Sequence, residues 1–359
     1  MFNLENYEIY KIINILGFLI GIAFGMIAQK NQFCFSGSIK DYILTNSTKR
    51  ASSVIMAMIV AIVSTYIISS YNELDLTQTN FYRDNINYFS IILGGALFGI
   101  GMMVADGCSS RHLIKFSQGD SNSLVTVIFI GIFAYATTKG FLNYPISQIS
   151  SNSTLIDLSS YLENIQLNIY FIIVPLLVVL WLLTKSFKRI FSLKDGFLIG
   201  LLISFGWYVT GVLGADVLEK QISLTSMTFV YPTAKTLEFF TYYEVNELSF
   251  SISIVLGVIL GGFFMSKINK KFSFGCTSNI KTSKLKSSMI GGALMGVGGV
   301  MAIGCTVGQG LTGLSTLAFA SVLAISSIML SGYITAIYLH KKEQLPMCFV
   351  FDWEEVDSK

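Results

Sequence analysis

The chain has 359 residues, of which 53% are hydrophobic and 13% are charged, and its formal net charge is +3. Its mean hydropathy of +0.64 excludes a soluble domain of this size, and the small net charge gives no reason to expect a nucleic-acid partner. Apolar runs long enough to cross a bilayer recur along the sequence. We therefore expect an all-α fold, that of a polytopic membrane protein.

Nine apolar segments are predicted to span the membrane, because a helix needs about 20 residues to cross the hydrocarbon core. In chain order they cover 12–29, 51–70, 89–106, 122–142, 168–184, 195–213, 249–266, 287–304 and 315–339. The leader before the first span carries Glu5 and Glu8 against a single Lys11, and no small-residue cleavage site follows it. This pattern indicates a retained helix and not a cleaved signal peptide.

The polar segments between the predicted spans alternate in charge. Lys and Arg gather in 30–50, 185–194 and 267–286, whereas 214–248 is net acidic. Cytoplasmic loops concentrate Lys and Arg, so we expect the N-terminus outside and the C-terminus inside. We interpret the basic residues as topology signals. The segments 143–167 and 214–248 are expected to be outer loops, the second with a short surface helix.

A glycine-rich sequence occurs twice. "GGALFGIGMMVADGC" ends at Cys108 and "GGALMGVGGVMAIGC" ends at Cys305, with nine of fifteen positions identical. A second pair, 16–35 and 256–276, repeats an LG pair, a Gly, a Phe, a Lys and a Cys. Duplication around a central site is common in transporters. It suggests a first repeat half at 1–142, connecting helices and outer loops at 143–248, a second half at 249–342 and a cytoplasmic tail at 343–359.

Four cysteines, Cys34, Cys108, Cys276 and Cys305, lie where an apolar helix breaks, and small or hydroxyl residues follow each of them. Such residues cap helix N-termini, and a broken helix inside a membrane must be buried in protein or line a wet cavity. We therefore expect short re-entrant half-helices whose N-termini attract an anion. The predicted substrate-binding residues are Cys34, Cys108, Cys276, Cys305, Ser109, Thr306, Gly308 and Gly310.

Other chemistries fit the cysteines less well. The predicted outer loops contain no Cys for a disulfide framework, and the chain has two His and no CxxC pair, so we expect no metal and no cofactor. Asp106, two residues before Cys108, has two readings: a functional carboxylate within the membrane, or a residue at its cytoplasmic edge. Arg111 and His112 are assigned to that same edge.

Three motifs resemble one family. "NQFCFSGSIKD", "DGCSS" and "GGALMGVGGVMAIGCTVGQGLTGLSTLAFAS" are similar to the YeeE/YedE-type sulfur-transport membrane proteins of bacteria, over nearly the whole chain. The resemblance implies an inner-membrane carrier that takes up thiosulfate, or in some members serves selenium metabolism. It implies that Cys34, Cys108 and Cys305 contact the sulfur compound along a central path, with Cys276 a weaker match.

The same resemblance implies a partner and marks one departure. Family members often work with a small cytosolic TusA-like sulfurtransferase, which here would be a separate chain. The family often has Gly where this chain has Asp106, so a carboxylate stands beside the implied anion path.

The chemistry of a thiol path agrees with this implication. Thiosulfate carries charge on a large, soft terminal sulfur, and conduction requires sites weak enough to release it. Cys S–H is a weak donor, so several thiols would form a chain of shallow sites. Two alternatives stay open: a membrane thiol enzyme that uses Cys persulfides, for which only Asp106 and His112 could serve as acid or base, and a structural or regulatory subunit. Our leading expectation is a transporter and not an enzyme.

Overall fold

The computed structural model describes residues 4–82, 87–151, 168–185, 187–215, 223–241, 248–273 and 282–345. Within these ranges the regular structure is helical, so the all-α prediction is confirmed. The α-helices are α1 (Leu4–Asn31), α2 (Phe35–Thr45), α3 (Lys49–Tyr71), α4 (Tyr88–Val104), α5 (Ser109–Ser117), α6 (Ser121–Thr138), α7 (Asn143–Ser151), α9 (Ile169–Thr184), α10 (Phe187–Phe191), α11 (Lys194–Tyr208), α12 (Val230–Thr241), α13 (Phe250–Ile268), α14 (Thr282–Met301) and α15 (Phe319–Lys341). Short 3-10 turns, η1 (Leu76–Gln78) and η2 (Asn80–Tyr82), and π-helical segments, η3 (Val209–Leu213) and η4 (Gly308–Gly313), complete the described elements.

Seven helical stretches in the described ranges are long and apolar enough to cross a bilayer: Ile9–Thr45, Lys49–Tyr71, Tyr88–Ser117, Ser121–Thr138, Lys194–Leu213, Phe250–Ile268 and Phe319–Lys341. Each coincides with one of the predicted spans. The predicted count of nine is not confirmed. Of the two remaining predicted spans, α9 has only 16 residues, and α14 begins with a polar turn that contains Lys284 and Lys286.

The two copies of the glycine-rich sequence pack directly against each other. α4 and α14 run antiparallel, with Gly94 facing Gly298 and Gly101 facing Gly291. A Cβ on Gly94 would lie 2.8 Å from the carbonyl oxygen of Gly298, and one on Gly298 would lie 2.6 Å from that of Gly94. Small residues permit such close backbone approach between helices in a membrane. The duplication therefore supplies both faces of one interface, and its two helices run in opposite directions.

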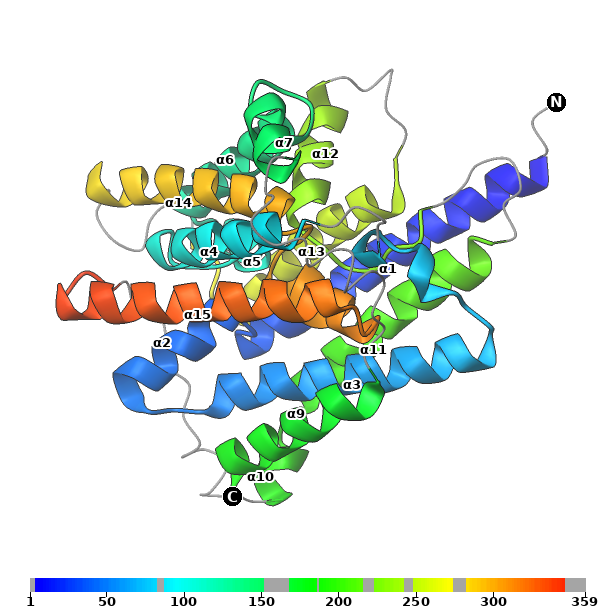
Figure 1. The fold of residues 1–359 in the computed structure, drawn as a ribbon, viewed down its shortest axis with the longest axis horizontal. Coiled ribbons are helices and arrows are strands. Elements are labelled where there is room, and N and C mark those ends of the chain that lie inside the picture. Colours follow the sequence, from blue (N-terminus) through cyan, green and yellow to red (C-terminus); the bar gives the residue numbers. More distant parts are fainter. Residues whose placement is uncertain are drawn as a thin grey trace.

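The second repeated pair behaves differently. α1 and α13 also meet through glycines, but they run parallel, because Gly17 lies against Phe250 and Gly25 against Val258. Helices α15 and α6 flank the α4–α14 pair, and α3 packs on α11 (Figure 1). The long helices lie roughly along one axis of the molecule, and those ends of α4 and α15 that lead to Asp106 and Lys341 are on the same side.

The segment 223–241 corrects one expectation. It begins as extended chain and continues as α12, so a helix does form within the predicted outer loop 214–248. It is not a surface helix, however. Met227 and Phe229 are fully buried, as are Val230 and Ala234 at its start, and α12 packs on α6, α13 and α14. The aromatic and aliphatic side chains of this stretch therefore contribute to the core of the molecule.

The outer surface is apolar where a bilayer would contact it. On α9, Phe171 and Trp181 are exposed, and on α15, Leu330 and Ile334 are exposed. Exposed apolar side chains on long helices are stable in lipid, where every backbone polar group is bonded within the helix. The buried interior, by contrast, contains the cysteines and a set of charged side chains.

Candidate functional site: three cysteines and a basic pocket

Cys34, Cys108 and Cys305 occupy the same place in three copies of one backbone turn. In each copy, the residue two positions earlier has a left-handed backbone, with φ of 57° at Gln32, 67° at Asp106 and 57° at Ile303. A non-glycine residue in this conformation costs about 1–3 kcal/mol and persists only where the surroundings impose it. Its recurrence before all three cysteines indicates a common structural role for the turn.

Each cysteine then begins a new helical segment. The backbone N–H four residues later donates to the cysteine carbonyl, at 3.1 Å for Ser38 to Cys34, 3.0 Å for His112 to Cys108 and 2.7 Å for Gln309 to Cys305. The sulfurs of Cys34 and Cys305 also accept from the N–H three residues later, at 3.4 and 3.3 Å. These two cysteines occupy the N-cap position that Ser, Thr, Asp or Asn usually fills.

The three turns meet inside the molecule. The thiols of Cys34 and Cys108 lie close enough to interact directly, and the Thr306 side chain, next to Cys305, lies beside the Cys108 thiol. Three helix N-termini therefore point toward one region, and each carries partial positive charge from its free N–H groups. Ser36 and Ser110 share hydrogen bonds with the Cys34 and Cys108 sulfurs at 3.1 and 3.3 Å.

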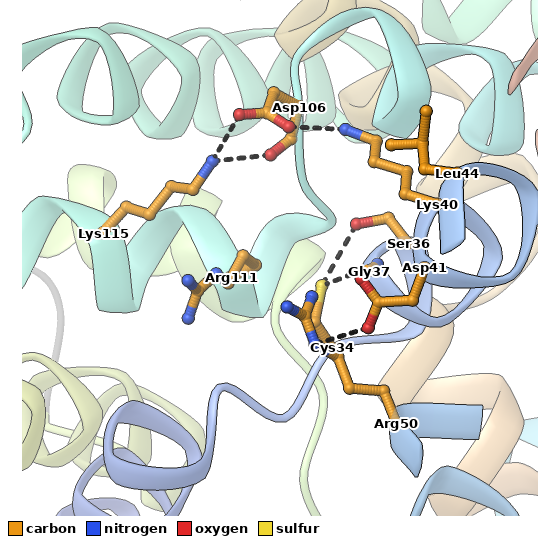
Figure 2. A pocket seen from close by; sticks show the side chains of 10 residues that line it. All are labelled: Cys34, Ser36, Gly37, Lys40, Asp41, Leu44, Arg50, Asp106, Arg111 and Lys115. Carbon is orange, nitrogen blue, oxygen red and sulfur yellow. Dashed lines mark hydrogen bonds and ion pairs between the residues drawn. The ribbon is translucent and has the colours of Figure 1, made fainter. Parts of the chain in front are cut away.

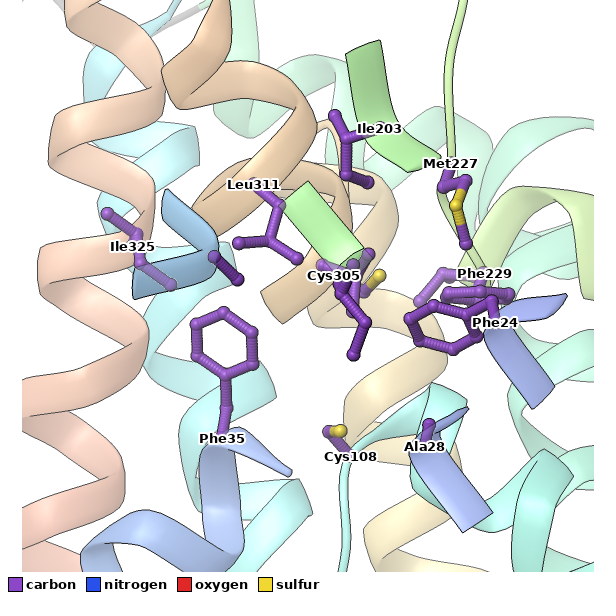
Figure 3. Close-up of a cluster of buried hydrophobic side chains, with 14 of the residues drawn as sticks. Phe24, Ala28, Phe35, Cys108, Ile203, Met227, Phe229, Cys305, Leu311 and Ile325 are labelled. Carbon is purple, nitrogen blue, oxygen red and sulfur yellow. The ribbon is translucent and has the colours of Figure 1, made fainter. Parts of the chain in front are cut away.

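Besides these polar neighbours, apolar side chains pack around Cys108 and Cys305. Both side chains are fully buried, and Figure 3 shows them among Phe24, Met227 and Phe229. The rings of Phe24 and Phe229 pack with their centroids 5.4 Å apart. Such a cluster excludes water around the two sulfurs.

The predicted hydroxyl residues lie in this region. Ser109 and Thr306 are 2% and 0% exposed, and within the described part of the chain neither hydroxyl has a hydrogen-bond partner. An unpaired buried hydroxyl costs free energy unless a ligand or water satisfies it. Both hydroxyls follow a cysteine directly, so both are available to a polar group that passes the thiols.

The predicted glycines have a packing role in the structure. A Cβ on Gly310 would lie 2.9 Å from the Phe35 ring, and one on Gly308 would lie 2.6 Å from the Thr228 hydroxyl. Their absence of side chains lets the η4 segment approach α2 and the extended segment before α12. Cys276, the fourth predicted cysteine, lies outside the described residues.

A basic pocket adjoins Cys34. Its empty space is about 390 Å³, part of it open to solvent, and it is lined by Cys34, Ser36, Gly37, Lys40, Asp41, Leu44, Arg50, Asp106, Arg111 and Lys115 (Figure 2). We call these ten residues the basic pocket. Four cations stand against two carboxylates, so the lining carries two positive charges in excess.

Both carboxylates of the basic pocket are bound to cations. Asp106 bridges Lys40 and Lys115, with Nζ–O distances of 2.5 and 2.8 Å, and Lys115 also donates to the Asp106 carbonyl at 2.7 Å. Asp41 pairs with Arg50 at 3.0 Å. Each of the four cationic residues is at least nine-tenths buried. Water therefore screens their charges poorly.

The basic pocket is the part of the site that the sequence did not predict. Lys40, Arg50 and Lys115 were interpreted as topology signals, and Arg111 as a marker of the membrane edge. All four instead have nearly buried side chains around Cys34. The signal was present in "FCFSGSIKD", because a Lys and an Asp stand at positions 6 and 7 of the helix that the cysteine begins. In the structure Lys40 binds Asp106, and Asp41 binds Arg50 of α3.

His112 belongs to a separate chain of hydrogen bonds. Its Nδ1 is 3.1 Å from the Ser123 hydroxyl, which donates to Asp120 at 2.6 Å. This arrangement joins α5 to the start of α6. The other ring nitrogen, Nε2, is buried near the backbone of Gly107 and has no hydrogen-bond partner among the described residues.

Comparison with known proteins agrees with the composition of this site. The family model described as "Sulphur transport" matches residues 30–334, which include all three cysteine turns and the basic pocket. Two relatives are proteins named thiosulfate transporter TsuA. The one from Spirochaeta thermophila is 25% identical over 91% of this chain and 99% of its own length. The one from Escherichia coli is 24% identical over 82% of this chain and 86% of its own length. A third relative, named probable transporter YedE, from Escherichia coli, is 27% identical over 33% of this chain and 29% of its own length.

Proposed function

Because the chain belongs to the sulphur-transport family, we propose that it carries thiosulfate, or a related sulfur or selenium oxyanion, across a bacterial cytoplasmic membrane. The observation that carries this proposal is the convergence of three cysteine-capped helix N-termini beside a pocket with two excess positive charges. Thiosulfate has two negative charges. The relatives named thiosulfate transporter TsuA support this choice of substrate.

The path that we propose runs from Cys305 past Cys108 to Cys34. In the apolar region around Cys305 and Cys108, the donors near the anion are thiols, the hydroxyls of Ser109 and Thr306, and backbone N–H groups. These are neutral donors, and they bind an anion less strongly than Lys or Arg would. An anion held in this way can move on, which conduction requires.

The basic pocket, at the Cys34 end of the path, acts on the anion through charge. At Cys34 the anion reaches four buried cations, which favour its entry from the apolar region into the pocket. Because the pocket is partly open to solvent, hydration can complete the transfer. In this scheme the neutral thiols bind the anion weakly enough for it to move on. The basic pocket then lowers the electrostatic energy of the anion at one end of the path.

The orientation that we propose places the basic pocket at the cytoplasmic side. The ends of helices that lie on the pocket side carry Lys49, Lys194 and Lys341. Positive charge at one side of a membrane protein marks the cytoplasm, so the N-terminus is outside. We propose that a separate cytosolic TusA-like sulfurtransferase receives the anion there. No cofactor takes part in this scheme.

The membrane thiol enzyme is the weaker alternative. It requires an acid or base close to a reactive sulfur, and the sequence offered Asp106 and His112. The Asp106 carboxylate is bound by Lys40 and Lys115, and Nδ1 of His112 faces Ser123. Asp106 and one nitrogen of His112 therefore have other partners, whereas Nε2 of His112 has none among the described residues. We favour passage of an anion over chemistry on it, because the carboxylate is bound by two lysines.

Uptake of radiolabelled thiosulfate into liposomes that contain the purified protein tests the proposal. We expect saturable uptake that unlabelled thiosulfate inhibits and that replacement of Cys108 by Ala abolishes. Liposomes without protein and liposomes with Cys108→Ala protein are the controls. Thiosulfate uptake equal to that of empty liposomes would contradict the proposed function. Release of sulfite from thiosulfate by the protein in detergent would favour the enzyme.

A further inference from the structure

Asp106 connects two half-helices across the basic pocket. Its carboxylate binds Lys40, which belongs to α2, and Lys115, which belongs to α5. Figure 2 shows the carboxylate between the two ammonium groups, on the far side of the pocket from Cys34. The side chain of Asp106 is 21% exposed, whereas those of Lys40 and Lys115 are 8% and 11% exposed. The carboxylate is therefore the most hydrated member of this group of three.

In the proposed path, an anion that leaves Cys34 passes these lysines, which line the same pocket with Asp106 on the far side from Cys34. The oxygens of a small dianion and those of a carboxylate accept hydrogen bonds from the same ammonium groups. The two cannot both occupy the positions that Asp106 now fills at 2.5 and 2.8 Å from the Nζ atoms. Asp106 and the departing anion are therefore competitors for Lys40 and Lys115.

We propose that Asp106 is an internal competitor that speeds release of the anion from the basic pocket. When the anion moves toward solvent, the carboxylate returns to the two lysines and replaces it. In this scheme Asp106 is not needed for the anion to reach Cys34. It is a residue that sets the balance between binding and release at this end. The inference rests on the proposed function, since it assigns a step of transport to this pocket.

The excess charge of the pocket gives the direction of the effect. With Asp106 ionised, four cations and two carboxylates leave two positive charges, which balance the two negative charges of one thiosulfate. Without this carboxylate the excess rises to three, and the oxygens of Asp106 no longer displace the anion from Lys40 and Lys115. Binding becomes tighter and release becomes slower, which is the condition under which a binding site stops conducting.

The test compares Asp106→Asn with the unchanged protein in two assays: equilibrium binding of thiosulfate in detergent, and the concentration dependence of uptake into liposomes. We expect the Kd for thiosulfate to fall about tenfold, which is the effect of 1.4 kcal/mol, and the maximal uptake rate to fall by a similar factor. KM should fall together with the maximal rate. A merely structural role for Asp106 would instead lower the maximal rate without tightening binding.

Two further variants keep the test decisive. Asp106→Gly removes the carboxylate and suits the left-handed backbone at φ 67°, so it serves if the amide variant folds poorly. It should show the same tighter binding. Asp195→Asn is the matched control. Asp195 lies on the same side of the protein, its carboxylate accepts a hydrogen bond from the Ser53 hydroxyl at 2.6 Å, and it does not line the basic pocket. It should leave both assays unchanged.

The outcomes separate the inference from the proposed function. Unchanged or weaker thiosulfate binding in both Asp106 variants would overturn the inference while transport by the unchanged protein stands. Absence of transport and of thiosulfate binding in the unchanged protein would instead remove the proposed function. Tighter binding together with an unchanged maximal rate would also overturn the inference, because release would then not depend on Asp106.

Discussion

Cys34 and Cys305 have the same backbone and opposite surroundings. Both follow a left-handed residue, both cap a helical segment with sulfur, and both accept an N–H three residues later. Around Cys305 the neighbours are Met227, Phe229 and other apolar side chains, whereas Cys34 opens on four cations. One local motif thus serves two electrostatic environments.

The difference teaches what the turn itself contributes. Because the cysteine turn has the same geometry in both surroundings, nearby charges do not determine that geometry. The turn directs a thiol and a helix N-terminus into the interior of the protein. Charge is added separately, by α2, α3 and α5 at one end. The apolar end limits passage to species that neutral donors can hold, and the charged end favours anions. Experiments can break this comparison at either end.

The largest effect is expected from removal of a thiol at the apolar end. Cys305→Ala leaves the anion without a side-chain donor from that residue in a region where water is excluded, so we expect thiosulfate uptake to fall to the level of empty liposomes. Cys34→Ala should reduce uptake less completely, because the cations of the basic pocket remain. Uptake by liposomes that contain equal amounts of each protein measures this order.

Cys348→Ala is the matched control for these variants, since that cysteine belongs to no helix break in the sequence. It should transport at the unchanged rate. Normal uptake by Cys305→Ala would remove this residue from the path, and equal loss at both positions would mean that the cations do not substitute for a thiol.

The charge difference should also appear in thiol labelling. In single-cysteine variants, a negatively charged methanethiosulfonate should react faster than a positively charged one at Cys34, by about tenfold, which corresponds to about 1.4 kcal/mol. At Cys305, fully buried and away from the basic pocket, both reagents should react slowly and without preference for either sign. Mass spectrometry of labelled protein over time gives both rates. A preference for the cationic reagent at Cys34 would contradict the electrostatic difference between the two ends.

The sequence was sufficient for the motif and insufficient for its surroundings. Apolar runs of about 20 residues predict helices, because a helix satisfies all the backbone polar groups of one segment in lipid. The repeated Gly-Cys endings identified the turns at Cys108 and Cys305. The position of Lys40 and Lys115 in the basic pocket was not predicted. In the sequence, a lysine near a helix end looks the same whether its side chain faces the cytoplasm or lines a pocket. The buried position of Phe229 was missed for a similar reason, since its segment is polar enough to resemble a loop.

A smaller effect is expected where the two glycine-rich copies meet, because this interface fixes the distance between the two ends. Gly94→Ala adds a methyl group 2.8 Å from the Gly298 carbonyl oxygen and 2.5 Å from the Met301 Cβ, neither of which can move without its helix. Overpacking of this kind costs about 1–3 kcal/mol. Thermal unfolding in detergent should show a lower midpoint.

Gly131→Ala provides the comparison for Gly94→Ala. Its added methyl group would meet mainly the end of the Leu237 side chain, at 2.2 Å, and that side chain can rotate. Its midpoint should stay close to that of the unchanged protein. Equal destabilisation by the two substitutions would mean that the α4–α14 contact is not especially tight.

The smallest effect is expected from the ion pair at the apolar end of the molecule. Lys139, which follows α6 at its end nearest the Cys305 turn, donates to Glu238 at 3.1 Å, and its side chain is 53% exposed. This hydrogen bond to Glu238 raises the pKa of Lys139 above its ordinary value, so any stabilisation is present at neutral pH and is lost as the pH rises through the raised pKa. Water screens an exposed pair strongly. We therefore expect Lys139→Gln to leave thiosulfate uptake unchanged and to lower the unfolding midpoint only slightly at pH 7, with the difference gone at strongly alkaline pH. A clear loss of uptake in Lys139→Gln would show that charge also matters at the Cys305 end, and the two ends would then differ less than their buried surroundings indicate.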